Sequence, residues 1–383
     1  METREITASK LCKQVYDGLF RRLCQAMLIH PMMLPRRLVA LVLALALFLA
    51  QSLAWAGGPV PGKEWARAAS PEAAGWSSDK LRAAQAYSRT IDTAAVVIVA
   101  NGQVVDEWGR VAERFNIHSM RKSIMSALVG MAVAEGRMRL DASLAQLGVD
   151  DNEPSLTTAE QQATVRDLLK ARSGVYHPAL YETPGMAALR PPRGSHAAGT
   201  HWYYNNWDFN ALGSIYEKQV GRSIFTAFQT QLSQPLQMQD FRLGDGEYFR
   251  GRASIHPAYP LRMTARDLAR FGLLYLRGGM WGEQQVVPAA WVRESVQSYS
   301  DAGFAGGYGY LWWVAVNGRH LPLVNLPAGS YSARGAGGHF VLVIPAYDTV
   351  IVHRVDTDLR GRHVDNRQFG ELVRLILEAR KSR

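Results

Sequence analysis

The sequence predicts an α+β fold: an antiparallel β-sheet built from N- and C-terminal segments, flanked by helices, with a mainly helical inserted domain. Three observations support this class. Strand patterns occur at residues 94–108 and again at 308–355, helical spacing dominates about 137–300, and a helical pattern ends the chain. The early and late strands would have to form one sheet, with the helical region as an insertion beside it.

The first 56 residues predict a leader that is not part of this fold. An apolar run at 38–50 follows two arginines and precedes the small-residue motif Ala54-Trp55-Ala56. A charged start, a short apolar run and a small-residue cleavage site together are typical of a secretory signal. We therefore expect an extension and signal peptide at 1–56, a folded domain at 57–383, and a periplasmic or secreted protein. Membrane attachment is expected only through this segment, if it stays uncleaved.

Charge and cysteine content exclude several function classes. Cys12 and Cys24 both lie in the leader, so the folded domain can form no disulfide and has no thiol chemistry. The net charge of +10 is dispersed along the chain without a Lys/Arg block, so nucleic-acid binding is not expected. The histidines show no metal-ligand spacing and no phosphate-binding loop is present, so we expect neither a metal nor a cofactor.

The first element of the fold is a predicted β-hairpin. Apolar stretches at 94–100 and 103–108 flank Asn101-Gly102. Asn-Gly accepts the positive φ that a two-residue hairpin turn requires at both positions. Helical patterns follow at 164–169, 208–220 and 264–278.

Strand patterns return late in the chain. Residues 308–316 are aromatic and β-branched, and apolar runs at 339–344 and 349–355 flank a turn at 345–348. A final helix is predicted over about 366–381. These late strands are the ones expected to pair with the first hairpin.

Ser119 and Lys122 form the most informative pair in the sequence. Their i, i+3 spacing places both side chains on one face of a helix. A serine hydroxyl needs a nearby base to become a nucleophile, and a desolvated lysine can be that base. The residues that follow have apolar helical spacing, which predicts a buried helix: Ile124, Leu128, Met131 and Ala132. A plain core helix capped by Ser119 is the alternative interpretation of this segment.

A second pair with the same spacing, Ser77 and Lys80, is interpreted differently. Ser77 precedes an acidic first turn containing Asp79. This pattern is typical of a helix N-cap. We therefore expect a structural role for Ser77.

Two further segments complete a pattern with Ser119-x-x-Lys122. They are the aromatic stretch at 201–213 and the glycine-rich stretch at 330–340. Together the three resemble the penicillin-recognising serine hydrolase superfamily, most closely class C β-lactamases, family VIII esterases and 6-aminohexanoate-dimer hydrolases. The resemblance covers nearly all of the chain after the leader and implies the β-lactamase/transpeptidase fold.

The second motif of this family is Tyr-x-Asn, and two registers fit it here. One register is Tyr203 with Asn205, and the other is Tyr204 with Asn206. The family pattern has a glycine seven residues after the asparagine, which Gly213 satisfies for the second register. We therefore choose Tyr204 and Asn206.

The resemblance implies that Tyr204 lies beside Ser119 and Lys122 as a co-base. A phenol near an ammonium is expected to have a lowered pKa, so that the two groups share one proton. Asn206 would position Lys122 or the acyl group of the substrate.

The third motif departs from the β-lactamase pattern. The Lys-Thr-Gly position falls on Ala333-Arg334-Gly335, so an alanine replaces the lysine that helps hold the carboxylate of a β-lactam. Arg334 is basic, but neighbouring residues of a strand point to opposite faces, so it need not take over that role. By resemblance, the backbone amides of Ser119 and Ala336 would form the oxyanion hole.

His339 follows the glycine-rich stretch and could reach the mouth of the cleft, although a structural role is the stronger interpretation. With Asn206, Arg334, Gly335 and Ala336 it makes up the predicted substrate-orienting set. The expected function is a serine hydrolase that acts on small esters or amides through an acyl-enzyme. The alternatives are a class C-like β-lactamase, a D-amino-acid peptidase, or a non-catalytic protein that binds a cell-wall ligand.

Overall fold

The computed structural model describes residues 58–381. The predicted leader at 1–56 lies outside the described residues. The described residues belong to one compact unit, and no helix among them is long and apolar enough to cross a membrane.

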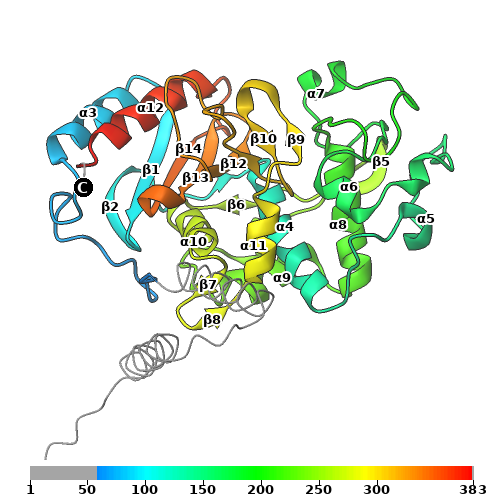
Figure 1. Ribbon diagram of the computed structural model, residues 1–383, viewed down its shortest axis with the longest axis horizontal. Helices are drawn as coiled ribbons and strands as arrows, with labels where there is room; N and C mark the ends of the chain where they lie inside the picture. Colours follow the sequence, from blue (N-terminus) through cyan, green and yellow to red (C-terminus); the bar gives the residue numbers. More distant parts are fainter. Residues whose placement is uncertain (1–57, 382–383) are drawn as a thin grey trace, which may run out of the picture. The chain divides into compact units, whose positions relative to one another are not determined.

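An eight-stranded sheet lies at the centre of this unit, and its neighbouring strands pair antiparallel (Figure 1). The strand order is β2-β1-β14-β13-β12-β11-β10-β9. The first hairpin and the late strands therefore share one sheet, as the sequence predicted. The strands are β1 (Thr93–Ala100), β2 (Gln103–Gly109), β9 (Ser300–Asp301), β10 (Gly307–Tyr308), β11 (Trp313–Val314), β12 (Tyr331–Gly335), β13 (His339–Ile344) and β14 (Thr349–Val355).

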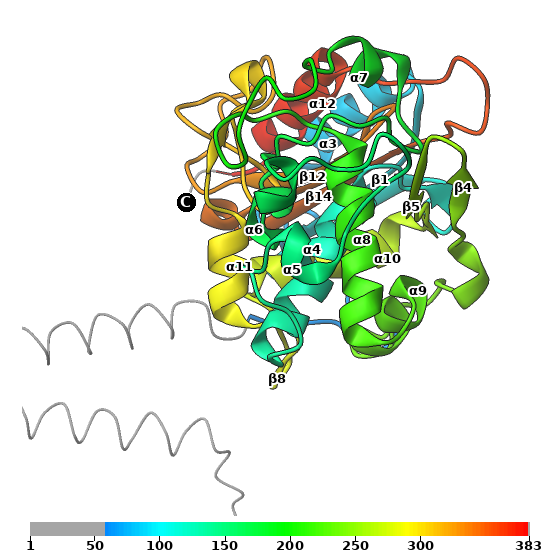
Figure 2. The same cartoon turned by 90° about the vertical axis from the view of Figure 1, so that its right-hand side faces the viewer.

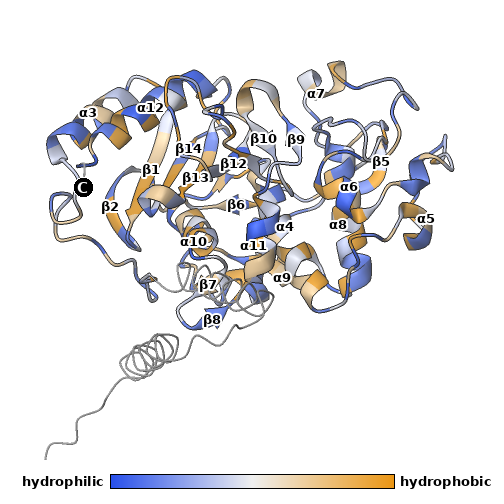
Figure 3. Cartoon of the chain, viewed as in Figure 1, coloured by the Kyte–Doolittle hydropathy of each residue, from blue (hydrophilic) through white to orange (hydrophobic). Residues whose placement is uncertain are grey.

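The local sequence explains the first hairpin and the centre of the sheet. Asn101 and Gly102 both have positive φ, at 50° and 75°, as the two-residue turn requires. Strands β13 and β14 are buried at every position. Hydropathy colouring shows them as apolar segments, as expected for strands with both faces covered (Figure 3).

Helices cover the two faces of this sheet. On one face, α3 (Ser78–Ser88) and α12 (Asn366–Glu378) pack against each other (Figure 1). The ring of Phe369 stacks on Phe340 of β13 with ring centres 3.9 Å apart. On the other face, α10 (Ala265–Leu276) contacts β1, β13 and β14. The central strands are buried because both faces are occupied.

The region between the early and late strands holds most of the remaining helices (Figure 2). Its longest are α4 (Met120–Ala134) and α8 (Asn206–Val220), which contact each other. The shorter helices are α5 (Leu144–Leu147), α6 (Val165–Leu169), α7 (Pro184–Ala188), α9 (Ile224–Phe228) and α11 (Ala289–Ser295). Small two-stranded sheets accompany them: β3 (Phe115–Asn116) with β6 (Arg262–Met263), β4 (Phe249–Gly251) with β5 (Ser254–Ala258), and β7 (Met280–Trp281) with β8 (Gln284–Gln285).

Two details of the expected fold are wrong. The single strand expected at 308–316 is two short strands, β10 and β11. Leu311 between them has φ 63°, and the N–H of Gly309 donates to the carbonyl of Trp312 at 2.8 Å, so the chain turns back. In addition, α10 falls within the expected helical insertion but packs on the central sheet.

Ser77 has the structural role expected from the sequence. It is the N-cap of α3, and its hydroxyl accepts a hydrogen bond from the backbone N–H of Lys80 at 3.4 Å. The Lys80 amine instead donates to the carbonyl of Glu378 at 3.1 Å. The two side chains of this pair therefore serve different structural contacts.

A glycine of α4 sets how closely α11 can approach. A Cβ on Gly130 would lie 2.3 Å from the ring of Trp291. Glycine to alanine in a helix ordinarily stabilises by up to about 1 kcal/mol. We expect Gly130→Ala instead to lower the free energy of unfolding by about 1–3 kcal/mol, because the ring must move out of a packed interface.

The control for this prediction is Gly185→Ala in α7, where the added methyl meets nothing within 4 Å. This variant should be neutral or stabilised by up to about 1 kcal/mol. Denaturant unfolding of both variants measures the difference. A Gly130→Ala variant as stable as Gly185→Ala would contradict the packing argument.

Candidate active site

Ser119 lies at the start of α4 but does not cap it. Its backbone occupies the N-cap position, yet its hydroxyl accepts no hydrogen bond from the first turn of the helix. Residues Met120 to Ala132 of α4 are all buried. A buried helix therefore presents a serine whose hydroxyl is free for another partner, at the helix end that bears partial positive charge.

Lys122 is that partner. Its Nζ lies 2.9 Å from Ser119 Oγ and 2.7 Å from the hydroxyl of Tyr204. It also lies 4.2 Å from the ring centre of Tyr204 and 4.4 Å from that of Phe209. The side chain is only 1% exposed, and burial, together with the nearby Arg121 charge, holds the pKa of Lys122 well below its ordinary value. An amine in this environment is available as a neutral base.

Tyr204 completes a contiguous set of three side chains with Lys122 and Ser119. Burial raises the pKa of its phenol to about 12, and the hydrogen bond with Ser119 and the charges of Arg121 and Arg334 oppose that rise only in part. The lowered pKa expected from the sequence is therefore wrong, because loss of water outweighs the neighbouring charges. The phenol keeps its proton at neutral pH.

The neighbouring residues explain why only one Tyr-x-Asn register reaches Lys122. The hydroxyl of Tyr203 donates to the carbonyl of Met186 at 2.6 Å. Asn205 is the N-cap of α8, where its Oδ1 accepts from the N–H of Asp208 at 2.9 Å. Both residues of the rejected register thus have structural contacts.

Asn206 begins α8 and is buried. Its amide donates to the carbonyl of Tyr181, whereas its Oδ1 has no hydrogen-bond partner within residues 58–381. No hydrogen bond joins Asn206 to Lys122 in this part of the chain. Its expected role in orienting the lysine or the acyl group stays a prediction.

The glycine-rich stretch passes beside the residues that precede Ser119. A Cβ on Gly335 of β12 would lie 2.5 Å from the carbonyl oxygen of Ile117 and 3.3 Å from the Cβ of His118. Only a glycine lets the two backbones come this close. Within the described chain, the N–H groups of Ser119 and Ala336 donate to no protein acceptor. Two free N–H donors therefore flank this close approach.

The altered third motif places its side chains differently from a lysine. Ala333 is completely buried, so its position offers no cation. The Arg334 guanidinium lies 4.9 Å from the ring centre of Trp313 and donates to the carbonyl of His320 at 2.9 Å. Burial lowers the pKa of Arg334 to about 9. Because the Trp313 ring also contacts Tyr204, with centres 5.3 Å apart, Arg334 borders the site through this tryptophan.

His339 lies inside the protein. It is completely buried, and its Nδ1 accepts a hydrogen bond from Arg354 Nε at 3.0 Å. Burial, together with the Arg354 charge, holds the pKa of His339 well below its ordinary value. His339 is therefore a buried structural histidine, and its expected part in the substrate-orienting set is wrong, because its ring is hydrogen-bonded to Arg354 and does not reach the surface.

An aromatic cluster beside Tyr204 was not found from the sequence. Tyr308 and Trp313 lie with ring centres 5.8 and 5.3 Å from that of Tyr204. Trp202 contacts both of them at 5.7 and 6.1 Å, and its indole N–H is buried without a partner among the described residues. Single aromatic residues in a sequence predict a position in the core as readily as a position in a binding site. Only the fold therefore identifies this cluster, which we call the aromatic wall.

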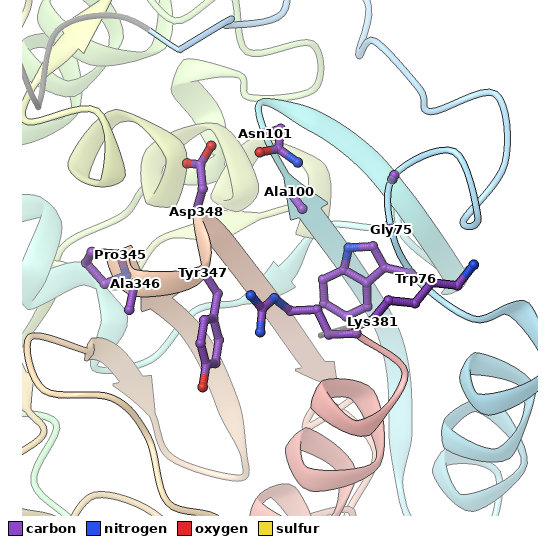
Figure 4. A pocket seen from close by; sticks show the side chains of 11 residues that line it. Gly75, Trp76, Ala100, Asn101, Pro345, Ala346, Tyr347, Asp348 and Lys381 are labelled. Carbon is purple, nitrogen blue, oxygen red and sulfur yellow. The ribbon is translucent and has the colours of Figure 1, made fainter. Parts of the chain in front are cut away.

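A separate cavity of about 520 Å³ contains none of these residues. It lies between the first hairpin turn, the turn after β13 and the end of α12, where Trp76, Asn101, Tyr347 and Lys381 line it (Figure 4). The chemistry-bearing side chains therefore lie elsewhere in the molecule.

Comparison with known proteins agrees with this arrangement. The family model described as "Beta-lactamase" matches residues 78–370. An uncharacterised protein of Alkalihalophilus pseudofirmus is 23% identical over 325 residues, which cover 74% of this chain and 91% of that protein.

Two solved structures show the shared fold. A class C β-lactamase in complex with cefoxitin is 18% identical with a TM-score of 0.56, over 78% of this chain and 97% of that one. EstCE1, a hydrolase with promiscuous acyltransferase activity, is 14% identical with a TM-score of 0.57, over 79% of this chain and 98% of that one. The family match spans most of the chain, and the chain belongs to the β-lactamase family of hydrolases.

Proposed function

We propose that this protein is a serine hydrolase that acts on small esters or amides through an acyl-enzyme, with Ser119 as the nucleophile. One observation supports the proposal above all others. The Nζ of a buried Lys122 lies within hydrogen-bond distance of both Ser119 Oγ and the hydroxyl of Tyr204. A non-catalytic binding protein has no need for a desolvated amine next to a serine hydroxyl.

In the acylation step, Ser119 Oγ bonds to the carbonyl carbon of the substrate while its proton passes to the neutral amine of Lys122. Tyr204 gives its proton to the leaving alcohol or amine and regains one from Lys122. The N–H groups of Ser119 and Ala336 stabilise the oxyanion, each by about 3 kcal/mol in comparable hydrolases. Water then attacks the acyl-enzyme, with the same pair accepting and returning the proton.

Short esters and small amides are the preferred substrates over β-lactams. The reason is Ala333, which is completely buried and leaves no lysine to hold the carboxylate of a β-lactam. The half-buried rings of Trp202 and Trp313 instead offer apolar surface, and the Trp313 ring contacts that of Tyr204 with centres 5.3 Å apart. This location is suited to the apolar part of an acyl or leaving group.

We expect Ser119→Ala to lower kcat/KM for a p-nitrophenyl ester by at least about 1,000-fold without a change in Tm, because the nucleophile is lost. Ser77→Ala is the matched control. It should leave turnover unchanged and cost about 1 kcal/mol of stability, because Ser77 only caps α3.

Intact-mass analysis after fluorophosphonate treatment measures the same assignment directly. The wild type should gain one adduct, at Ser119, and Ser119→Ala should gain none. A wild type that stays unmodified would favour the non-catalytic binding protein instead.

The pH dependence follows from the lowered pKa of Lys122. The base is needed unprotonated, so kcat/KM should reach its plateau at a pH well below the ordinary pKa of lysine and fall about tenfold per pH unit once Lys122 takes up a proton on acidification. The phenol of Tyr204 stays protonated across the plateau, since its pKa is about 12.

A pH–rate profile of Tyr204→Phe provides the control. This variant should lose turnover but keep the acid limb, because burial and Arg121 are what lower the pKa of Lys122. Activity that climbs steadily toward the ordinary pKa of lysine would exclude the neutral-amine mechanism.

Substrate preference tests the consequence of Ala333. We expect kcat/KM for a p-nitrophenyl ester to exceed that for nitrocefin by roughly 100-fold or more, because the lactam carboxylate loses its charged partner. Both rates are measured on the same preparation. Nitrocefin turnover equal to or faster than ester turnover would identify a β-lactamase.

A further inference from the structure

The turn after β14 touches both backbone segments that hold the free N–H donors. Thr357 lies in this turn and is half-buried. Its Oγ1 is 2.8 Å from Nε2 of His118, the residue directly before Ser119. Its methyl group packs on the glycine-rich stretch, where a Cβ on Gly337 would lie 2.4 Å from Thr357 Cγ2. One side chain therefore contacts the neighbours of both N–H donors.

The hydrogen bonds around Thr357 have a defined direction. Arg354 Nε can only donate, so the Nδ1 of His339 accepts and its proton lies on Nε2. That Nε2 lies 3.4 Å from Thr357 Oγ1. The Thr357 hydroxyl oxygen thereby accepts a hydrogen bond from His339. The proton of the same hydroxyl is then donated to Nε2 of His118. This series of hydrogen bonds runs from Arg354 through His339 and Thr357 to His118.

Arg354, the first donor in this series of hydrogen bonds, is held in place by buried backbone carbonyls. The Arg354 guanidinium is completely buried and donates to the carbonyls of Met263, Phe115 and Asn116 at 2.7, 3.1 and 3.1 Å. Its position is thus set by β3 and β6. An arginine held at three points provides a rigid origin for the bonds to His339 and Thr357.

The series of hydrogen bonds ends at His118, whose backbone conformation needs support. His118 has φ 48°, a left-handed conformation that costs a residue other than glycine about 1 kcal/mol or more. Its N–H donates to Asn116 Oδ1 at 2.8 Å, and its side chain is held by Thr357. The peptide group between His118 and Ser119 contains the Ser119 N–H. The conformation of His118 therefore aims that donor.

We propose that Thr357 is a positioning residue that holds His118 and the glycine-rich stretch so that the Ser119 and Ala336 N–H groups converge on one oxyanion. The hydroxyl fixes the first donor through His118, and the methyl group fixes the second through Gly337. This role rests on the proposed hydrolase function. Thr357 itself touches no reacting atom.

Replacement of the hydroxyl tests the proposal. Thr357→Val keeps the shape of the side chain and removes the bond to His118. We expect kcat for a p-nitrophenyl ester to fall roughly 10- to 100-fold, as for a misaligned catalytic group, with KM within about twofold of wild type. The rate of fluorophosphonate labelling should fall in parallel, since it forms the same charged oxygen.

Three companion variants separate positioning from stability. Thr357→Ser restores the hydroxyl but not the methyl group, and should recover the part of the lost kcat that depends on the bond to His118. Thr349→Val removes a threonine hydroxyl at the start of β14, one that donates to the carbonyl of Tyr347 at 2.8 Å, and should leave kcat unchanged. If Thr357→Val fails to fold, Thr357→Ala removes both the hydroxyl and the methyl group and should show at least the same loss.

The outcomes distinguish this proposal from the function on which it rests. A wild type that is labelled at Ser119, with Thr357→Val turning over at the wild-type rate, overturns the positioning role alone. Thr357→Ala as fast as wild type also overturns it, because that variant lacks both the hydroxyl and the methyl group. A wild type that neither labels nor hydrolyses esters overturns both.

Discussion

The burial of one amine determines how the rest of the site is arranged. Lys122 projects from a helix that is buried along most of its length, between a serine hydroxyl and a phenol. Desolvation of an ammonium is costly, so this environment favours the uncharged amine. The same burial keeps the phenol of Tyr204 protonated. A lysine with a lowered pKa thereby lies within hydrogen-bond distance of both a serine hydroxyl and a phenol that keeps its proton.

The fold supplies that burial from several directions. The central sheet and α8 enclose α4, and Gly130 lets Trp291 of α11 approach its backbone. The aromatic wall encloses the phenol. These contacts come from segments distant in sequence, so an exposed Ser-x-x-Lys spacing, such as the one at Ser77, acquires none of them. Chemistry here depends on the enclosure as much as on the residue types.

Much of the architecture could be predicted, because turn residues and apolar runs in the sequence indicate the strands and hairpins that they form. Asn101-Gly102 specifies a hairpin, and two runs of apolar residues specify β13 and β14. Leu311 could not be predicted, since a leucine gives no sign of left-handed backbone, and the aromatic strand expected around it is wrong. The pKa direction of Tyr204 was missed for a related reason, because burial is a property of packing. Thr357 is 239 residues from His118 along the chain, beyond the reach of any local pattern.

Arg354 has one more consequence. Its charge is balanced by carbonyl dipoles and a neutral imidazole, and no carboxylate within the described residues pairs with it. Dissolved ions weaken attractions between exposed charges but hardly reach a guanidinium enclosed by backbone. The backbone around Arg354 and His118 is therefore insensitive to ionic strength, and its geometry should be the same in dilute buffer and in concentrated salt.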